Sequence, residues 1–142
     1  MTALLDTCAV LWAARQPERL SAHVGGLLLD SREELVLSVV SAWEIALKPE
    51  LGITDVARWF RLAARNLQAR ILPVRLEHIA VLEKLPLRHR DPFDRLLVAQ
   101  AVAGQFVLLT PDEAIRKYPE VNCVWDGAAG DSSRSSGRST PG

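Results

Sequence analysis

The sequence predicts an α/β domain built on a mainly parallel β-sheet. Short apolar runs bounded by turn residues alternate along the chain with longer segments of helical periodicity, which is the pattern of βαβ units. The chain has 142 residues, of which 49% are hydrophobic and 24% charged, enough apolar material for one domain with a buried core. Basic and acidic residues number 17 each, so a nucleic acid or an anionic membrane would have to be bound by a local patch.

Breaker residues divide the first half of the chain into strands and helices. The elements expected here are a strand at 2–6, a helix at about 8–15, a helix at about 20–30 and a strand near 35–39. A further helix follows this strand up to Lys48, where Pro49 stops it and Gly52 allows the chain to turn. This half therefore supplies two strands of the sheet.

The second half continues the alternation. A helix over 55–68 begins at Asp55 as its N-cap and is indicated by apolar residues at helical spacing, namely Val56, Trp59, Phe60, Ala63 and Leu67. The elements expected after it are a strand within 70–74, a helix at about 76–85, a loop at 86–90, a helix from Asp91 to Gly104 and a strand at 106–110. We therefore expect parallel strands joined by helical crossovers.

The two ends of the chain differ in composition. Residues 127–142 are rich in Gly and Ser and have no large apolar side chain, so we expect a disordered tail after a domain at 1–126. The N-terminal apolar run contains Asp6 and lacks a basic segment, which makes it a poor signal peptide and too short to cross a bilayer. Cys8 and Cys123 form no CxxC pair and suit buried free thiols. We expect a reduced, cytoplasmic protein without a membrane partner.

Four acidic residues recur at equivalent places in the predicted units. Each stands at or just past the end of an apolar run, or in the first turn of a predicted helix; they are Asp6, Glu44, Asp94 and Asp112. In an open parallel sheet the carboxyl ends of the strands lie along one edge, where ligands bind. We therefore expect the four carboxylates to meet in one pocket at that edge.

Helix capping is the structural alternative for these acids. Ser41-x-x-Glu44 fits a capping box, although Ser38 competes as the N-cap. The run DPFD at 91–94 supplies an N-cap, a proline and an acid in one first turn. The other two aspartates fit a strand end or a turn. Helical spacing nevertheless turns Asp94 toward the apolar side of its helix, and a buried carboxylate needs a partner.

Four ionised carboxylates in one pocket would repel one another. At about 5 Å and an effective dielectric constant near 20, each pair is unfavourable by about 3 kcal/mol. Either some carboxylates take up protons or a divalent cation lies among them. Oxygen ligands favour Mg²⁺ or Mn²⁺ over zinc, and His23, His78 and His89 show no metal-ligand spacing. A site of this kind can hold a phosphate oxygen and activate water for phosphodiester hydrolysis.

Motifs for other chemistries are absent from the sequence. The chain contains no GxxxxGK[ST], GxGxxG, HExxH or GxSxG. A phosphatase or phosphoacceptor with Asp6 as its nucleophile is a rival hypothesis. The haloacid-dehalogenase type of phosphatase needs a second aspartate two residues later, where this chain has Cys8.

Four stretches of the chain match a known family in order and spacing. They are LLDTCAVLWA, LSVVSAWEIALK, LPLRHRDPFDRLLVAQA and LLTPDEAIRKYPEVNCVW, and together they extend over nearly all of positions 3–125. They resemble the PIN-domain ribonucleases, specifically the VapC-type toxins of bacterial type II toxin–antitoxin systems. The resemblance implies a PIN-like three-layer α/β/α fold with a central, mainly parallel sheet. It also implies a Mg²⁺- or Mn²⁺-dependent endoribonuclease that forms a homodimer and is neutralised by a cognate antitoxin.

The resemblance also implies roles for individual residues. The catalytic and metal-binding set would be Asp6, Glu44, Asp94 and Asp112. Thr7 and Thr110, the hydroxyl residues beside the first and last acids, would orient ligands and water. Asp91 matches the family as well, but we interpret it as a helix cap. Cys8 stands where these toxins often carry histidine, and Pro49 shortens the helix that follows WEIALK.

Basic residues offer local sites for RNA phosphates. Residues 56–76 contain five arginines and no acid; the stripe of Arg58, Arg61 and Arg65 either contacts phosphates or is a solvated helix face. The run RHR at 88–90 directly precedes Asp91 and is the second candidate. We interpret the four tryptophans as core residues rather than stacking platforms: Trp12, Trp43, Trp59 and Trp125.

The function expected from these features is that of a sequence-selective, metal-dependent ribonuclease toxin. A non-catalytic PIN-fold module that binds RNA or a peptide in the same pocket is the alternative. Four intact acids argue against this alternative, because binding alone does not require them.

Overall fold

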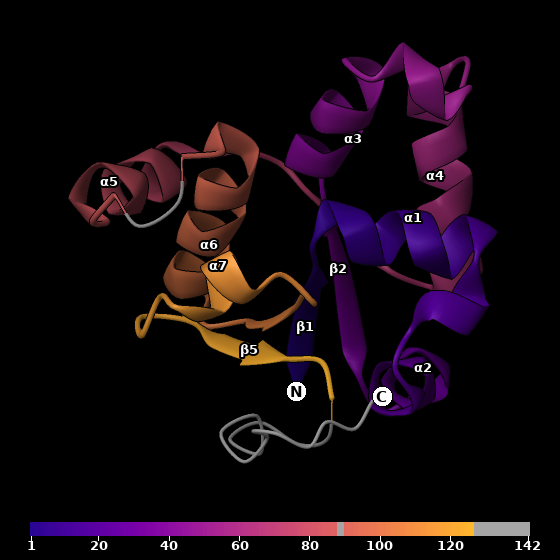
Figure 1. Cartoon of the computed structure of the whole chain (residues 1–142), viewed down its shortest axis with the longest axis horizontal. Coiled ribbons are helices and arrows are strands. Elements are labelled where there is room, and N and C mark those ends of the chain that lie inside the picture. The colour runs from indigo at the N-terminus through magenta and orange to yellow at the C-terminus, as the bar shows by residue number, and fades with distance from the viewer. Residues whose placement is uncertain (88–89, 127–142) are drawn as a thin grey trace.

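The centre of the molecule is one five-stranded sheet with the strand order β3-β2-β1-β4-β5. The computed structural model describes residues 1–87 and 90–126; the expected tail at 127–142 and residues 88 and 89 of the basic run lie outside this part. The strands are β1 (Thr2–Leu5), β2 (Glu34–Ser38), β3 (Arg70–Leu72), β4 (Val107–Leu109) and β5 (Asn122–Val124). Every neighbouring pair is parallel, so the carboxyl ends of all five strands lie along one edge (Figure 1).

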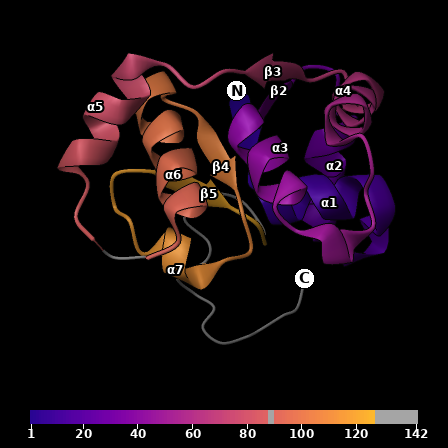
Figure 2. The same cartoon turned by 90° about the horizontal axis from the view of Figure 1, so that it is seen from above.

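Helices cover both faces of the sheet and make a three-layer α/β/α architecture (Figures 1 and 2). The helices on one side are α1 (Thr7–Arg15), α2 (Ala22–Leu29), α3 (Val39–Ala46) and α4 (Val56–Leu67). The helices on the other side are α5 (Leu76–Lys84), α6 (Pro92–Gly104) and the short α7 (Glu113–Arg116). The expected fold class is therefore confirmed. None of these helices is long and apolar enough to span a membrane in the part of the chain that the structure describes.

The core is divided between the two faces because strand side chains alternate. Leu4 and Val36 pack with α5, α6 and α7 on one side. Leu5 and Leu37, their neighbours along β1 and β2, pack with α1, α2 and α4 on the other. Successive residues of these strands are all apolar because both faces are covered.

The order of the strands places a topological switch beside β1. The chain moves outward from β1 to β2 and β3, and then returns to the other side of β1 as β4 and β5. The segment after β1 forms α1 on one face, and the segment after β4 forms α7 on the opposite face (Figure 1). Ligands of open α/β sheets bind in the crevice at such a point.

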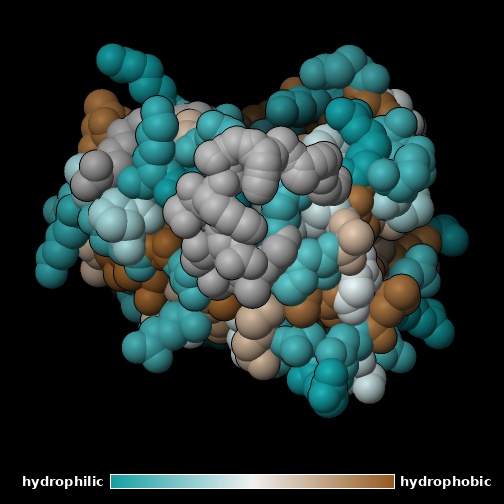
Figure 3. Space-filling model, turned by 60° about the horizontal axis from the view of Figure 1, so that its bottom comes forward, coloured by the Kyte–Doolittle hydropathy of each residue, from teal (hydrophilic) through white to brown (hydrophobic). Residues whose placement is uncertain are grey.

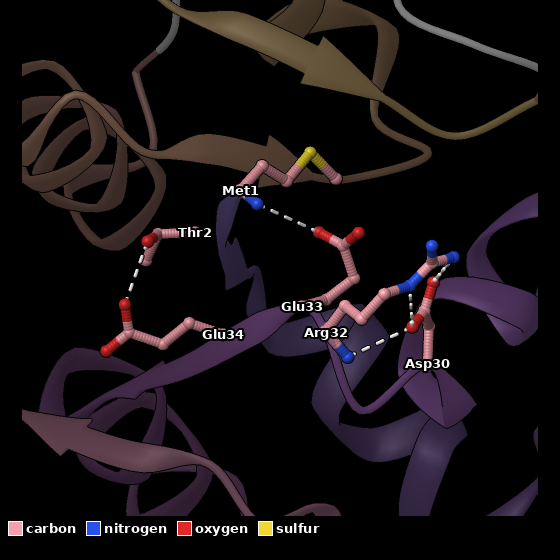
Figure 4. A network of polar contacts seen from close by, with 6 residues as sticks. All are labelled: Met1, Thr2, Asp30, Arg32, Glu33 and Glu34. Atoms are coloured by element: carbon pink, nitrogen blue, oxygen red, sulfur yellow. Dashed lines mark hydrogen bonds and ion pairs between the residues drawn. The ribbon is translucent and has the colours of Figure 1, made fainter.

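The opposite edge of the sheet is held by polar contacts (Figure 4). The N-terminal amine lies 3.3 Å from a carboxylate oxygen of Glu33, and the Thr2 hydroxyl donates to Glu34 across β1 and β2 at 2.9 Å. Arg32 pairs with Asp30 at 2.9 Å in the preceding turn. Figure 3 shows this side of the molecule, where hydrophilic residues surround small hydrophobic patches. These contacts fix the start of β1, whose other end carries Asp6.

Several expected elements differ in extent from those observed. The helix expected at about 20–30 is confirmed as α2, which Ser21 caps by accepting from the Val24 N–H, and a 3₁₀ turn at Pro17–Arg19 that was not expected precedes it. The helix expected up to Lys48 ends at Ala46, and a second 3₁₀ turn covers Pro49–Leu51. The elements α7 and β5 were not predicted; α7 has only four residues, which is too short to show helical periodicity.

Candidate active site at the carboxyl edge of the sheet

Two aspartates are placed by capping the helices that follow neighbouring strands. Asp6 is the N-cap of α1, and its Oδ1 accepts from the Ala9 N–H at 2.8 Å. Asp112 is the N-cap of α7, and its Oδ1 accepts from the Ala114 N–H at 2.8 Å. Carboxylates are favoured here because helix N-termini present unpaired N–H groups. Since β1 and β4 are adjacent, the two capping residues follow neighbouring strands. The Asp6 N–H also donates to the Leu109 carbonyl at 3.1 Å.

The third aspartate stands in the first turn of α6. Asp91 caps this helix by accepting from the N–H groups of Phe93 at 2.9 Å and Asp94 at 3.2 Å, and Pro92 occupies the first helical position. The capping interpretation of Asp91 is thus confirmed. Asp94 follows two residues later, with its side chain partly buried.

The three aspartates share one electrostatic environment. Asp6 is only 3% exposed, and burial is the main reason that its pKa is raised to about 7. Hydrogen bonds from the Thr110 hydroxyl and the Ala9 N–H lower this pKa, and the charges of Asp94 and Asp112 raise it. Asp94 and Asp112 therefore lie close enough to Asp6 for their charges to act on its carboxyl. Near neutral pH the Asp6 carboxyl is therefore partly protonated in the absence of a compensating cation.

Thr110 connects two members of the cluster. Its fully buried hydroxyl oxygen accepts from the Asp112 N–H at 3.0 Å, and the same hydroxyl is hydrogen-bonded to the Asp6 carboxylate. Thr7 is placed differently: its hydroxyl donates to Ser41 Oγ at 2.9 Å and joins α1 to α3. Of the two threonines, Thr110 contacts the acidic cluster, whereas Thr7 connects α1 and α3.

Glu44 is held by a different set of contacts. Its side chain is 6% exposed, and its Oε2 accepts from Lys48 Nζ at 3.0 Å. Its Oε1 is buried without a hydrogen-bond partner in the described part of the chain. The hydrogen bond to Glu44 is the main reason that the pKa of Lys48 is raised, and the charge of Asp91 adds to it. Lys48 was not singled out in the sequence, although its i, i+4 spacing from Glu44 is the usual signal of such a pair.

The start of α3 corrects one capping prediction. The N-cap is Ser38, whose Oγ accepts from the Val40 N–H at 3.0 Å, so the box between Ser41 and Glu44 is not formed. Ser38 also donates to Gln100 of α6 at 2.5 Å. This contact ties together the two helices that carry Glu44 and Asp94.

The exposure of Trp43 contradicts the prediction that all four tryptophans are core residues. Its side chain is 55% exposed and is not part of the core. The indole lies edge-on to the Phe93 ring, with 4.9 Å between the ring centroids. A helix of eight residues cannot bury every apolar face, because Glu44 and Ile45 already occupy its inward side. Of the other tryptophans, Trp125 is buried, while Trp12 and Trp59 are partly buried and pack against the core.

The donor set fits a hard divalent cation. The groups at this edge are oxygen ligands, one buried carboxylate oxygen of Glu44 lacks a partner in the described part of the chain, and the charges of Asp94 and Asp112 raise the pKa of Asp6. Within residues 1–87 and 90–126, no three acidic, histidine or cysteine side chains are close enough together to hold one ion. Burial raises the pKa of the Cys8 thiol to about 11, and the charge of Asp6 adds to this.

These features define a class of protein: a parallel α/β domain with an aspartate cluster at its switch point. The chain belongs to the PIN domain family, whose model matches residues 3–121. It is similar to Ribonuclease VapC22 of Mycobacterium tuberculosis (strain ATCC 25618 / H37Rv), with 28% identity over 87% of this chain and 98% of that protein.

Solved structures share the fold. One is VapBC2 from Rickettsia felis bound to a DNA fragment from their promoter, with a TM-score of 0.69 and 16% identity over 89% of this chain and 100% of that chain. Another is a toxin–antitoxin complex from Klebsiella pneumoniae, with a TM-score of 0.57 and 16% identity over 84% of this chain and 94% of that chain.

Proposed function

We propose that this chain is a VapC-like toxin: a divalent-metal-dependent endoribonuclease that a cognate antitoxin neutralises. The observation that carries the proposal is the cluster of Asp6, Asp94 and Asp112 at the switch point, with a pKa of about 7 at Asp6. Membership of the PIN family and similarity to a named ribonuclease support RNA as the substrate. The Klebsiella toxin–antitoxin complex supports a protein antagonist. A homodimer is part of the proposal.

The ligands of Mg²⁺ or Mn²⁺ in this proposal are Asp6, Asp94 and Asp112, with Glu44 contributing its unpartnered oxygen. When bound, the ion supplies a Lewis acid for a phosphate oxygen and lowers the pKa of water. Asp6 and Asp112 are preorganised for this role, because a helix N–H group holds each carboxylate and the Thr110 hydroxyl is bonded to the Asp6 carboxylate and to the Asp112 N–H. Lys48 holds the other Glu44 oxygen. Arg90 is exposed just before Asp91 and is a candidate contact for the RNA phosphates.

The test is cleavage of structured RNAs by the purified full chain, freed of antitoxin, with Mg²⁺ or with EDTA. Asp6→Ala and Asp112→Asn should abolish cleavage, and growth arrest on expression should be lost with them. Glu113→Gln is the matched control, because it removes an exposed acid next to Asp112 in the first turn of α7 and should cleave normally. RNA binding should survive Asp6→Ala or become tighter, since a negative charge has been removed.

The alternative is a binding module without catalysis, and the same assay separates it from the nuclease. RNA that stays intact across a broad panel while it still binds the wild type would establish the binding module. Cleavage that EDTA and Asp6→Ala leave unchanged would contradict the proposed mechanism.

A further inference from the structure

A second feature of the surface lies on α4 and the edge strand β3. None of its residues belongs to the aspartate cluster. A shallow hollow of about 600 Å³ is lined there by three arginines and by an apolar floor. The arginines are Arg58, Arg61 and Arg65, and the floor includes Leu62 and Ile71, whose side chains are 44% and 38% exposed. We call this set of five residues the arginine groove. Figure 2 shows α4 beside β3 at one edge of the molecule.

The three arginines form an unpaired row of positive charge. Their spacing in α4 places them on one face over about 10 Å of helix. Within residues 1–87 and 90–126, no carboxylate pairs with their guanidinium groups. Arg70, at the start of β3, is a contrast, since it is bound to Glu34 at 2.7 Å. A chain with equal numbers of acidic and basic residues thus concentrates uncompensated positive charge in one place, which favours an anionic partner.

The groove also offers features that a polypeptide can use. β3 is the terminal strand of the sheet, and Ile71 projects from it into the groove. The outer edge of β3 has no neighbouring strand in the described part of the chain, so its backbone can pair with an added one. RNA would use the arginines but would leave the apolar floor and the strand edge without a role. The combination therefore favours a protein segment over a phosphate backbone.

We propose that the arginine groove docks an acidic segment of a protein partner in extended conformation. Alternate residues of such a segment project on the same side about 7 Å apart, which lets its carboxylates reach the arginine row while the apolar stems of the same side chains lie over Leu62 and Ile71. Backbone hydrogen bonds to β3 would fix its register. The proposal does not depend on nuclease activity, because none of these residues belongs to the aspartate cluster.

The test uses the full chain in EDTA and three fluorescent probes. These are a synthetic peptide of alternating glutamate and valine, the same peptide with glutamine in place of glutamate, and a single-stranded RNA oligonucleotide. We expect the wild type to bind the glutamate peptide best. Arg61→Glu should weaken this binding about tenfold or more, because an attractive contact becomes repulsive. Ile71→Ser should also weaken peptide binding, because it removes an apolar contact from the floor of the groove. Lys84→Glu is the control: it reverses an exposed charge at the end of α5 and should have no effect on peptide binding.

The location of binding is checked by amide NMR on the same samples. Peptide binding should shift the amides of 70–72 and of α4, and should protect the β3 amides from exchange. Failure of the wild type to bind the glutamate peptide, or equal binding by Arg61→Glu, would overturn the proposal. RNA binding that Arg61→Glu abolishes, without peptide binding, would assign the groove to nucleic acid instead. Melting curves establish that Arg61→Glu and Ile71→Ser remain folded.

Discussion

At the scale of single residues, Asp6 shows how one carboxylate serves the fold and the site at once. Its Oδ1 caps α1, which favours the ionised form. Burial and two neighbouring aspartates favour the protonated form and prevail, with a pKa of about 7. A residue whose protonation is balanced near neutral pH responds to small changes in its surroundings.

The raised pKa of Asp6 predicts a pH-dependent stability in the absence of divalent ions. The ordinary pKa is 3.8 and the folded-state pKa is about 7, so between these values the native state binds more protons than the unfolded chain. The free energy of unfolding should therefore fall as the pH rises from about 4 to 7, by roughly 4 kcal/mol at most.

Urea unfolding in EDTA at about pH 5 and pH 8 measures this effect. Asp6→Asn keeps the cap but cannot ionise, so it should lose less stability than the wild type between the two pH values. Equal losses in both proteins would show that Asp6 does not titrate in this range.

Thr110 provides a second prediction at this scale. Thr110→Val removes the hydroxyl that hydrogen-bonds Asp6 and accepts from the Asp112 N–H, so the pKa of Asp6 should rise further and stability should fall by about 1–2 kcal/mol. Thr110→Ser keeps the hydroxyl and should leave the pKa of Asp6 near that of the wild type. Carboxyl NMR titration distinguishes the two variants; a pKa lowered by Thr110→Val would contradict the assigned hydrogen bond.

At the scale of elements, helix termini decide where the functional side chains lie. The DPFD run could be interpreted from sequence because proline and capping residues act locally, and Asp55 was identified as the cap of α4 for the same reason. Ser38 and Ser41 could not be told apart. Both are good capping residues, and the end of β2, which tertiary pairing sets, determines which one starts the helix.

The end of α6 shows a different limit of sequence patterns. The helix was expected to end at Gly104, and Gly104 is indeed its last residue, but the left-handed conformation that often favours glycine at a helix end falls on Gln105, with φ of 57°. Gly104 is required for space instead, since a Cβ there would lie 2.5 Å from the Phe106 ring. Glycine thus stands at the end of α6 because of the space that the Phe106 ring occupies, and not because of a left-handed backbone conformation.

Gln105→Gly should stabilise the protein. Glycine adopts a left-handed conformation without the steric cost of a side chain, and we expect a gain of about 0.5–1 kcal/mol in the free energy of unfolding. Gln105→Ala keeps the Cβ and should show no such gain. Chemical denaturation of the two variants makes the comparison, and a less stable glycine variant would disprove the proposed strain.

At the scale of the whole molecule, the topology places Asp6 and Asp112, which are distant in the sequence, at the ends of neighbouring strands. Their placement after apolar runs was enough to anticipate a shared edge, because the carboxyl ends of parallel strands must meet. The exposure of Trp43 and the apolar floor of the arginine groove could not be predicted in this way. Each depends on how α3 and α4 pack against the rest of the domain, which short-range patterns do not determine.

Divalent ions should stabilise the whole fold. Mg²⁺ or Mn²⁺ would bind the native cluster and not the dispersed acids of the unfolded chain, so melting temperatures should rise with ion concentration, by about 2.7 kcal/mol of stability at a hundredfold excess over the Kd. Asp94→Asn should weaken this rise, whereas Asp30→Asn, at the opposite edge of the sheet, should not. Melting curves of the wild type that millimolar ions leave unchanged would count against a native-state site.

The most direct measurement is the anomalous scattering of manganese in a crystal of the full chain. The account predicts a peak at the carboxyl edge of β1 and β4, within coordination distance of carboxylate oxygens from Asp6, Asp94 and Asp112. A peak bound by other residues, or saturating manganese with no peak at this edge, would contradict a shared metal site and with it the proposed nuclease centre.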